Sequence, residues 1–302
     1  MKKRILTIAL VIALLATCFA GTYAYLTDTD EAVNTMTLGN VSIDQLEYER
    51  EVDENGAYVT KTIDGINSYV LTDYVNDKAL YPAIIPNGGT VDGVTWDYDS
   101  TRVRMTQVDS WGTADVFNTP NAVDKFVTVE NTGLSAAYVR TLIAFEIGTA
   151  ELEDDNYPNQ PLISSEIRAG EVADGVQPWT YGYQGYVTIG GTKYLVMELI
   201  YTGAALGGGS WRHENGVLPA GETTYPSLCQ VYMASRATNE DVAALDGNNN
   251  GKYDILVLSQ AVQAAGFSGP QLALDTAFGT VADNAATWLA DAAAEAAADI
   301  AG

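Results

Sequence analysis

Apolar and polar side chains alternate in many short runs along this chain of 302 residues, and Gly, Asn, Asp and Pro separate the runs. Alternation with a period of two, broken by turn-forming residues, is typical of strands. In the run from Val139 to Ile147 the odd-numbered residues share one face, which we expect to be buried. Tyr138, Arg140 and Glu146 share the other face, which we expect to be wet. The pattern predicts an all-β fold, a jelly-roll-like β-sandwich with long loop insertions.

The run from Lys193 to Tyr201 is rich in apolar residues on both faces, which predicts a strand in the interior of a sheet. Glu198 interrupts this run. Because a buried carboxylate is costly unless it is paired, we expect Glu198 to have a partner.

Aromatic residues separated by small ones make up the segment from Trp179 to Tyr186. We expect Trp179, Tyr181 and Tyr183 to line one face of a strand and to pack on the sandwich. Aromatic faces beside polar groups also bind sugar rings or partner proteins, so a monomeric adhesin or glycan-binding module is an alternative function.

Helical patterns appear only towards the end of the chain. Asp254 is placed to cap a helix from Ile255 to about Ala265, and Gly266 is suited to end it. Beyond Thr280 an Ala-rich segment predicts a second helix with an acidic stripe. We therefore divide the chain into a signal peptide (1–24), a β-sandwich (25–245), and an Asn/Gly loop with one or two C-terminal helices (246–302).

The first residues predict export. Lys2, Lys3 and Arg4 precede an apolar stretch from Ile5 to Ala20, the layout of a signal peptide, and we expect cleavage after Ala24 or Tyr25. A transmembrane anchor is one alternative, although the apolar stretch is short for it. Lipidation at Cys18 is another, although Thr17 fits a lipobox poorly.

Charge and cysteine content restrict the partners. The formal net charge is −24, and it becomes −27 when the three basic residues of the signal are removed (−24 minus 3). Such a chain repels phosphate backbones, so we expect no nucleic-acid partner and contact with the membrane only during export. Cys229 is the only thiol after the signal, so no intramolecular disulfide can form. We expect this thiol to be buried and structural.

Two blocks of sequence resemble one known family. The first is Gly21–Ile43, with the sequence GTYAYLTDTDEAVNTMTLGNVSI, and the second is Lys125–Gly133 followed by Ala137–Leu142. Both are similar to the TasA and camelysin family of Gram-positive bacteria. The resemblance implies processing by a SipW-type signal peptidase, a secreted protein of the cell surface or biofilm matrix, and polymerisation into fibres. The segments 49–124 and 150–210 inherit nothing from it.

The exported N-terminus is the segment that we expect to contact another subunit. Leu26 to Met36 is polar, whereas Thr35 to Leu46 alternates well enough to form a strand. An extended terminus of this kind is suited to completing the sheet of a neighbouring copy, and the alternative is a flexible leader before the first strand. The expected contact residues are Leu26, Thr35, Met36, Leu38, Val41 and Ile43.

We expect no catalytic residue. His213 is the only histidine, so no site that needs two imidazoles can be built, and its polar surroundings predict an exposed turn. The enzyme alternative is a metallopeptidase, an activity described for camelysin. Here it would need a zinc site made almost wholly of carboxylates, which disfavours zinc.

The segment from Asp246 to Asp254 matches the first part of a calcium loop. Its oxygen-bearing side chains occupy relative positions 1, 3, 5 and 9, and Gly251 occupies position 6. Position 12 is Val257, which supplies no carboxylate. We expect either a plain turn or a weak calcium site, and no cofactor that the protein requires. The candidate ligands are Asp246, Asn248, Asn250 and Asp254.

Overall fold

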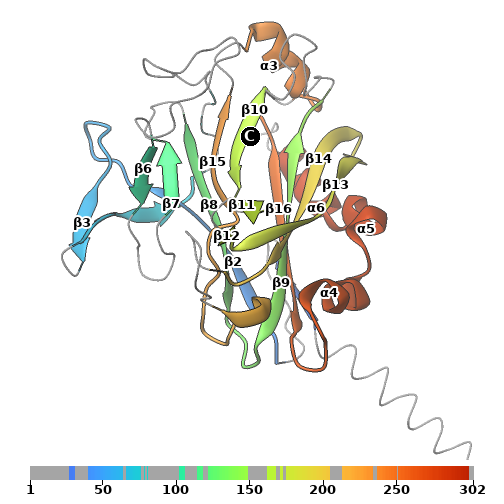
Figure 1. Cartoon of the computed structure of the whole chain (residues 1–302). Helices are drawn as coiled ribbons and strands as arrows, with labels where there is room; N and C mark the ends of the chain where they lie inside the picture. The colour runs from blue at the N-terminus through green and yellow to red at the C-terminus, as the bar shows by residue number, and fades with distance from the viewer. Residues whose placement is uncertain are drawn as a thin grey trace, which may run out of the picture.

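The computed structural model describes residues 27–30, 40–63, 66–75, 78, 80, 102–105, 114–117, 122–148, 162–167, 171–172, 175–204, 213–233, 237–249 and 251–298. Two five-stranded antiparallel sheets form a β-sandwich, and three helices lie on the outside of one of them (Figure 1). The predicted all-β sandwich is therefore confirmed. No helix among these residues is both long enough and apolar enough to cross a bilayer.

Sheet A has the order β1-β16-β9-β14-β13. Its strands are β1 (Thr27–Asp30), β16 (Ile255–Gln263), β9 (Ala137–Glu146), β14 (Thr192–Tyr201) and β13 (Trp179–Ile189). Sheet B has the order β10-β15-β8-β2-β5. Its strands are β10 (Ile163–Ile167), β15 (Leu228–Met233), β8 (Val123–Asn131), β2 (Ile43–Arg50) and β5 (Leu71–Asp73).

Three small two-stranded ribbons stand apart from the main sheets. They pair β3 (Thr60–Ile63) with β4 (Ile66–Tyr69), β6 (Arg102–Met105) with β7 (Ala114–Phe117), and β11 (Glu171–Val172) with β12 (Gly175–Val176). The helices are a 3-10 turn η1 (Glu214–Gly216), α3 (Asn239–Leu245), α4 (Pro270–Phe278), α5 (Val281–Trp288) and α6 (Ala290–Ala298).

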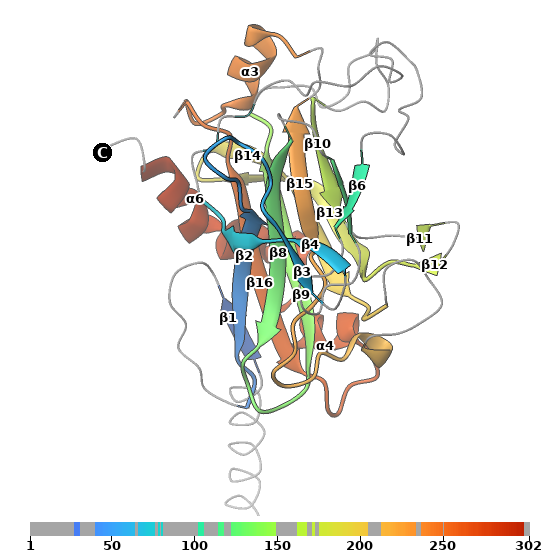
Figure 2. The ribbon, with the colours of Figure 1, turned by 90° about the vertical axis from the view of Figure 1, so that its left-hand side faces the viewer.

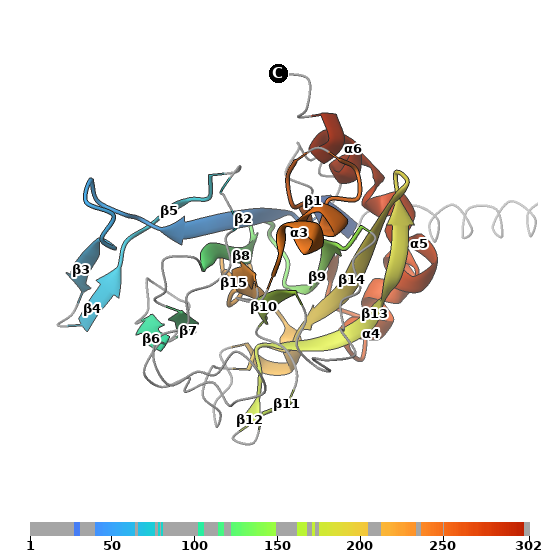
Figure 3. The same ribbon diagram turned by 90° about the horizontal axis from the view of Figure 1, so that it is seen from above.

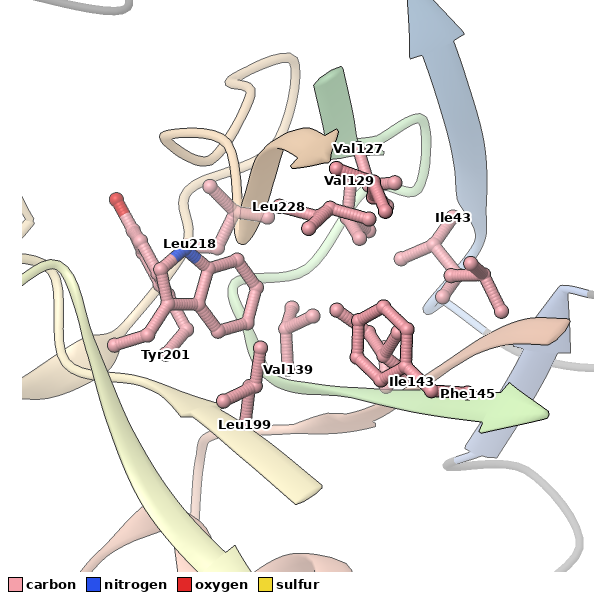
Figure 4. Close-up of a cluster of buried hydrophobic side chains, with 14 of the residues drawn as sticks. Ile43, Val127, Val129, Val139, Ile143, Phe145, Leu199, Tyr201, Leu218 and Leu228 are labelled. Atoms are coloured by element: carbon pink, nitrogen blue, oxygen red, sulfur yellow. The ribbon is translucent and has the colours of Figure 1, made fainter. Parts of the chain in front are cut away.

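Apolar side chains fill two layers. The first lies between the sheets, where residues of β2, β8 and β15 pack against residues of β9, β14 and β16 (Figure 4). The second lies between sheet A and the C-terminal helices, where Leu142, Ala144 and Leu258 contact Val281, Ala285 and Leu289. Cys229, the single cysteine among the described residues, is a free thiol, so burial of apolar side chains, chiefly in these two layers, stabilises the described fold.

The prediction that one face of β9 is wet is wrong. All ten of its residues are buried, because α4, α5 and α6 cover the outer face of sheet A. Arg140 lies under α4 and pairs with Asp275 of that helix, whereas Glu146 is covered by the loop from Gly247 to Asp254 and accepts hydrogen bonds from backbone N–H groups of that loop. The predicted burial of Cys229 is confirmed, with 0% of the residue exposed.

The predicted helix from Ile255 to Ala265 is also wrong, because these residues form β16. Ile255, Leu258 and Val262 do fall on a helical stripe, but Leu256, Val257 and Ala261 are equally apolar and buried. A strand that is buried on both faces is apolar on both, so its sequence does not alternate between apolar and polar residues. Here packing against the core on each side favours the strand over the helix. The region after residue 245 therefore contributes a strand to the interior of sheet A.

Candidate functional site

The margin of sheet A beside β16 is the place where the N-terminus meets the sandwich. β16 pairs with β9 along its whole length, from Ile255 to Gln263. On its other side it pairs with β1, but only through Ser259–Val262, which lie opposite Asp30–Thr27 (Figure 2). In the described part of the chain, the stretch Ile255–Leu258 has no strand on this side.

A cavity of about 1000 Å³ runs beside the uncovered stretch of β16. Ile255, Leu256 and Val257 line one side of it, and Gln45 and Glu47 of β2 line another. Helices α3 and α6 contribute further walls. β16 of sheet A and β2 of sheet B thus face a common space.

Polar contacts hold the walls of this cavity in place. The Ser259 hydroxyl donates to Gln45 Oε1 at 2.8 Å and so links β16 to β2 across the two sheets. Lys125 pairs with Glu47, and its ammonium lies 4.1 Å from the centre of the Tyr74 ring. The cavity is therefore a formed part of the sandwich and does not depend on an added strand for its shape.

The structure brings the two family-like blocks together. Asn40 accepts hydrogen bonds at 2.9 Å from the backbone N–H groups of Leu134 and Ser135, in the turn between β8 and β9. Gly133 is required in this turn, because a Cβ there would lie 2.6 Å from the backbone nitrogen of Ser42. The segment that starts at Asn40 is therefore fixed to the sandwich.

The predicted contact residues do not share one environment. Val41 and Ile43 are 1% and 0% exposed and belong to the core between the sheets of their own chain. Their side chains are thus committed within the subunit. Leu26, Thr35, Met36 and Leu38 lie outside the described residues.

The loop from Asp246 to Asp254 is organised around a buried carboxylate that the sequence did not single out. Glu146 is fully buried and accepts backbone hydrogen bonds from Gly247 at 2.7 Å, Asn248 at 3.3 Å and Asp254 at 3.1 Å. Burial and the nearby carboxylate of Asp254 raise the pKa of Glu146 to about 7, although the three N–H donors oppose the rise.

The proposed calcium ligands make contacts with their own loop. The side-chain amide of Asn248 donates to the Asp254 carboxylate at 2.8 Å, and the Asp246 carboxylate accepts from the Gly251 N–H at 2.8 Å. Asn250 lies outside the described residues. Among those that are described, no group of three or more His, Cys, Asp and Glu side chains converges as metal ligands would. The calcium site stays a prediction.

His213 is buried, and the prediction of an exposed turn is wrong. Only 6% of the residue is exposed, and Nδ1 lies 2.8 Å from the Tyr201 hydroxyl. Tyr201 in turn packs edge-on against Trp179. The polar neighbours of His213 in sequence gave no sign of this burial, because its contacts are with Tyr201 and Gly203, which precede it by twelve and ten residues.

The aromatic run forms β13, as predicted, but its rings do not share one face. Trp179 is completely buried and donates from Nε1 to the Tyr225 carbonyl at 3.1 Å. Tyr181 is 40% exposed. A register shift between Tyr181 and Gln184 turns Tyr183 to the opposite face, where it packs near α5.

Glu198 has the partner that its position requires, since its carboxylate accepts from Arg140 Nη1 at 2.9 Å. Arg140 was not identified from the sequence. The need of the buried Glu198 carboxylate for a cationic partner was the feature of the sequence that could have identified Arg140.

Comparison of the chain with protein-family models, with curated proteins and with solved structures gives no match.

Proposed function

We propose that this chain is a secreted structural protein that assembles into fibres at the cell surface or in a biofilm matrix, by exchange of its N-terminal strand between neighbouring copies. The observation that carries the proposal is the position of β1, a strand of four residues at the margin of sheet A, bonded to β16 and to no other strand among the described residues. Export is supported by the signal-like first residues.

A strand in this position is suited to exchange. The backbone hydrogen bonds that β1 makes with β16 of its own chain are the same ones that it would make with β16 of a neighbour. The free energies of pairing within one chain and between two chains therefore differ mainly through chain entropy and protein concentration. A higher concentration favours exchange between chains. The uncovered stretch Ile255–Leu258 and the cavity beside it leave room for a donor strand longer than β1.

Exchange of this kind produces a filament. The donor surface is the N-terminal strand and the acceptor surface is the β16 margin, so the contact is head-to-tail and does not close on itself. The polymer needs no cofactor, and the only other protein partner that we propose is the signal peptidase, of the SipW type. The high negative charge favours solubility of the free subunit outside the cell.

Paired proline substitutions in β1 test the mechanism. In an antiparallel pair, alternate residues turn their N–H groups toward the partner, so either Thr27 and Thr29 or Asp28 and Asp30 donate to β16. Proline has no N–H group. We expect electron microscopy to show fibres of the unmodified chain, starting at residue 25, and of only one of the double variants T27P/T29P and D28P/D30P.

Each double variant serves as the matched control of the other, because both carry two prolines in the same four residues. Fibres from both variants would exclude strand exchange through β1. An unmodified chain that stays monomeric in sedimentation at high concentration would overturn the structural function itself.

A further inference from the structure

One face of β13 points to the side of sheet B, and part of this face extends beyond the covered core of the sandwich. Tyr181 lies opposite Leu199, Gln184 opposite Met197 and Tyr186 opposite Leu195. Cross-strand partners point to the same face. Leu199 belongs to the core between the sheets, so these β13 side chains project on the side of sheet B.

The rings on this face are nevertheless exposed. Tyr181 is 40% exposed and Tyr186 is 57% exposed, whereas Trp179 at the start of the strand is 0% exposed. Figure 3 shows β13 as the outermost strand of sheet A, with α5 behind it. Beyond Trp179, the inner face of β13 is therefore a surface. We call it the tyrosine stripe and define it as Tyr181, Gln184, Tyr186 and Thr188 of β13 with Lys193 of β14.

The tyrosine stripe is held rigidly from behind. Tyr183, Val187 and Ile189 alternate with the stripe residues and pack on the opposite face of the strand with Val281 and Ala285 of α5. The Tyr183 N–H also donates to Glu198 Oε2 at 3.0 Å. A surface that is ordered before binding loses little conformational entropy when a ligand arrives.

The charge of the stripe differs from that of the whole chain. The formal net charge of the protein is −24, but the stripe contains no carboxylate and a single cation, Lys193, whose ammonium lies 4.6 Å from the centre of the Tyr186 ring. The nearby carboxylate of Glu198 is buried and is held by Arg140. The stripe thus offers two rings, an amide and a hydroxyl, in a molecule whose overall field repels anions.

We propose that the tyrosine stripe binds a neutral polysaccharide. The C–H faces of sugar rings stack on exposed tyrosine rings, while Gln184 and Thr188 donate to and accept from sugar hydroxyls. Tyr181 and Tyr186 lie opposite residues four apart on β14, so their backbones are separated by about 13 Å, enough for an extended glycan to contact both rings.

A second copy of the chain suits this surface less well. The register shift between Tyr181 and Gln184 interrupts the regular hydrogen-bonding edge of β13. Irregularities of this kind on an outer strand disfavour pairing with another strand. The proposal does not depend on strand exchange at β16, which lies on the other side of sheet A.

Binding of the purified chain to chitin, cellulose and curdlan tests the proposal, with carboxymethyl cellulose as the anionic comparison. We expect at least one neutral polymer to bind. Y181A and Y186A should each weaken this binding about tenfold, the value of one lost stacking contact. L134A removes an apolar side chain that is even more exposed, at 86%, from the turn between β8 and β9 and should leave binding unchanged. K193Q should also leave it unchanged, at low and high salt.

Four results would overturn the proposal: no binding to any of the three neutral polymers, full binding by Y181A/Y186A, binding to the anionic polymer alone, or a change in oligomeric state of Y181A/Y186A with glycan binding intact. Thermal unfolding shows whether each variant folds. If Y181A does not, Y181L keeps the apolar cover of the sheet and removes only the ring.

Discussion

Replacement of Arg140 by Met is expected to lower the free energy of unfolding by about 3–5 kcal/mol, because it leaves the buried carboxylate of Glu198 without its cation. Arg140 is 0% exposed. Its guanidinium donates to Glu198 at 2.9 Å, Asp275 at 3.1 Å, Gln260 at 2.8 Å and the Gly279 carbonyl at 3.1 Å. These partners lie on two strands of sheet A and on α4 and the residue after it.

The same substitution should loosen the C-terminal helices before the sandwich itself unfolds. Arg140 lies 5.0 Å from the centre of the Trp288 ring and 5.7 Å from that of Phe278, so it joins α4 and α5 to β9. Urea titration followed by tryptophan fluorescence measures the loss. K61M removes an exposed cation from β3 and should change the stability by less than about 0.5 kcal/mol. An R140M protein as stable as K61M would show that this network contributes nothing.

The strands of the sandwich could be predicted where alternation was clear, as in β9, or where a short run was apolar on both faces, as in β14. β16 could not, because its apolar residues serve two cores and satisfy a helical stripe as well as a strand. A local pattern does not reveal that a second layer, formed by α4–α6, covers sheet A from outside. The same layer explains why Arg140 is buried although it alternates with core residues, while Glu146 is buried by the loop from Gly247 to Asp254.

The sequence identified the N-terminal segment as the candidate contact region, but it did not show where that segment lies in the fold. The sequence indicated that the N-terminal segment is extended, and it did not indicate which strand lies beside it. That information depends on the antiparallel register of Thr27 with Val262, which are far apart in the chain. Burial of Val41 and Ile43 in the core of their own subunit likewise depends on the docking of the segment after Asn40 against the turn at Gly133.

Glu146 makes the stability of this protein depend on pH in a direction opposite to that of most carboxylates. Burial raises its pKa from an ordinary value of 4.5 to about 7 in the folded chain. Between these values the folded state binds more protons at this site than the unfolded state does, so the contribution of Glu146 to stability is complete below pH 4.5 and is lost as the pH rises to about 7. The loss amounts to about 3 kcal/mol.

Comparison with E146Q isolates this contribution, because glutamine has no proton to lose. The groups that face Glu146 are Asp254 in the loop, Tyr253 next to it and Tyr194 of β14, and both proteins retain all three. We measure the free energy of unfolding of both proteins in urea at pH 5 and at pH 8. The value for E146Q minus the value for the parent should be about 3 kcal/mol higher at pH 8 than at pH 5. A constant difference would mean that Glu146 keeps an ordinary pKa in the folded chain. The hydrogen bonds from the backbone N–H groups of Gly247, Asn248 and Asp254 would then fully offset the cost of its burial.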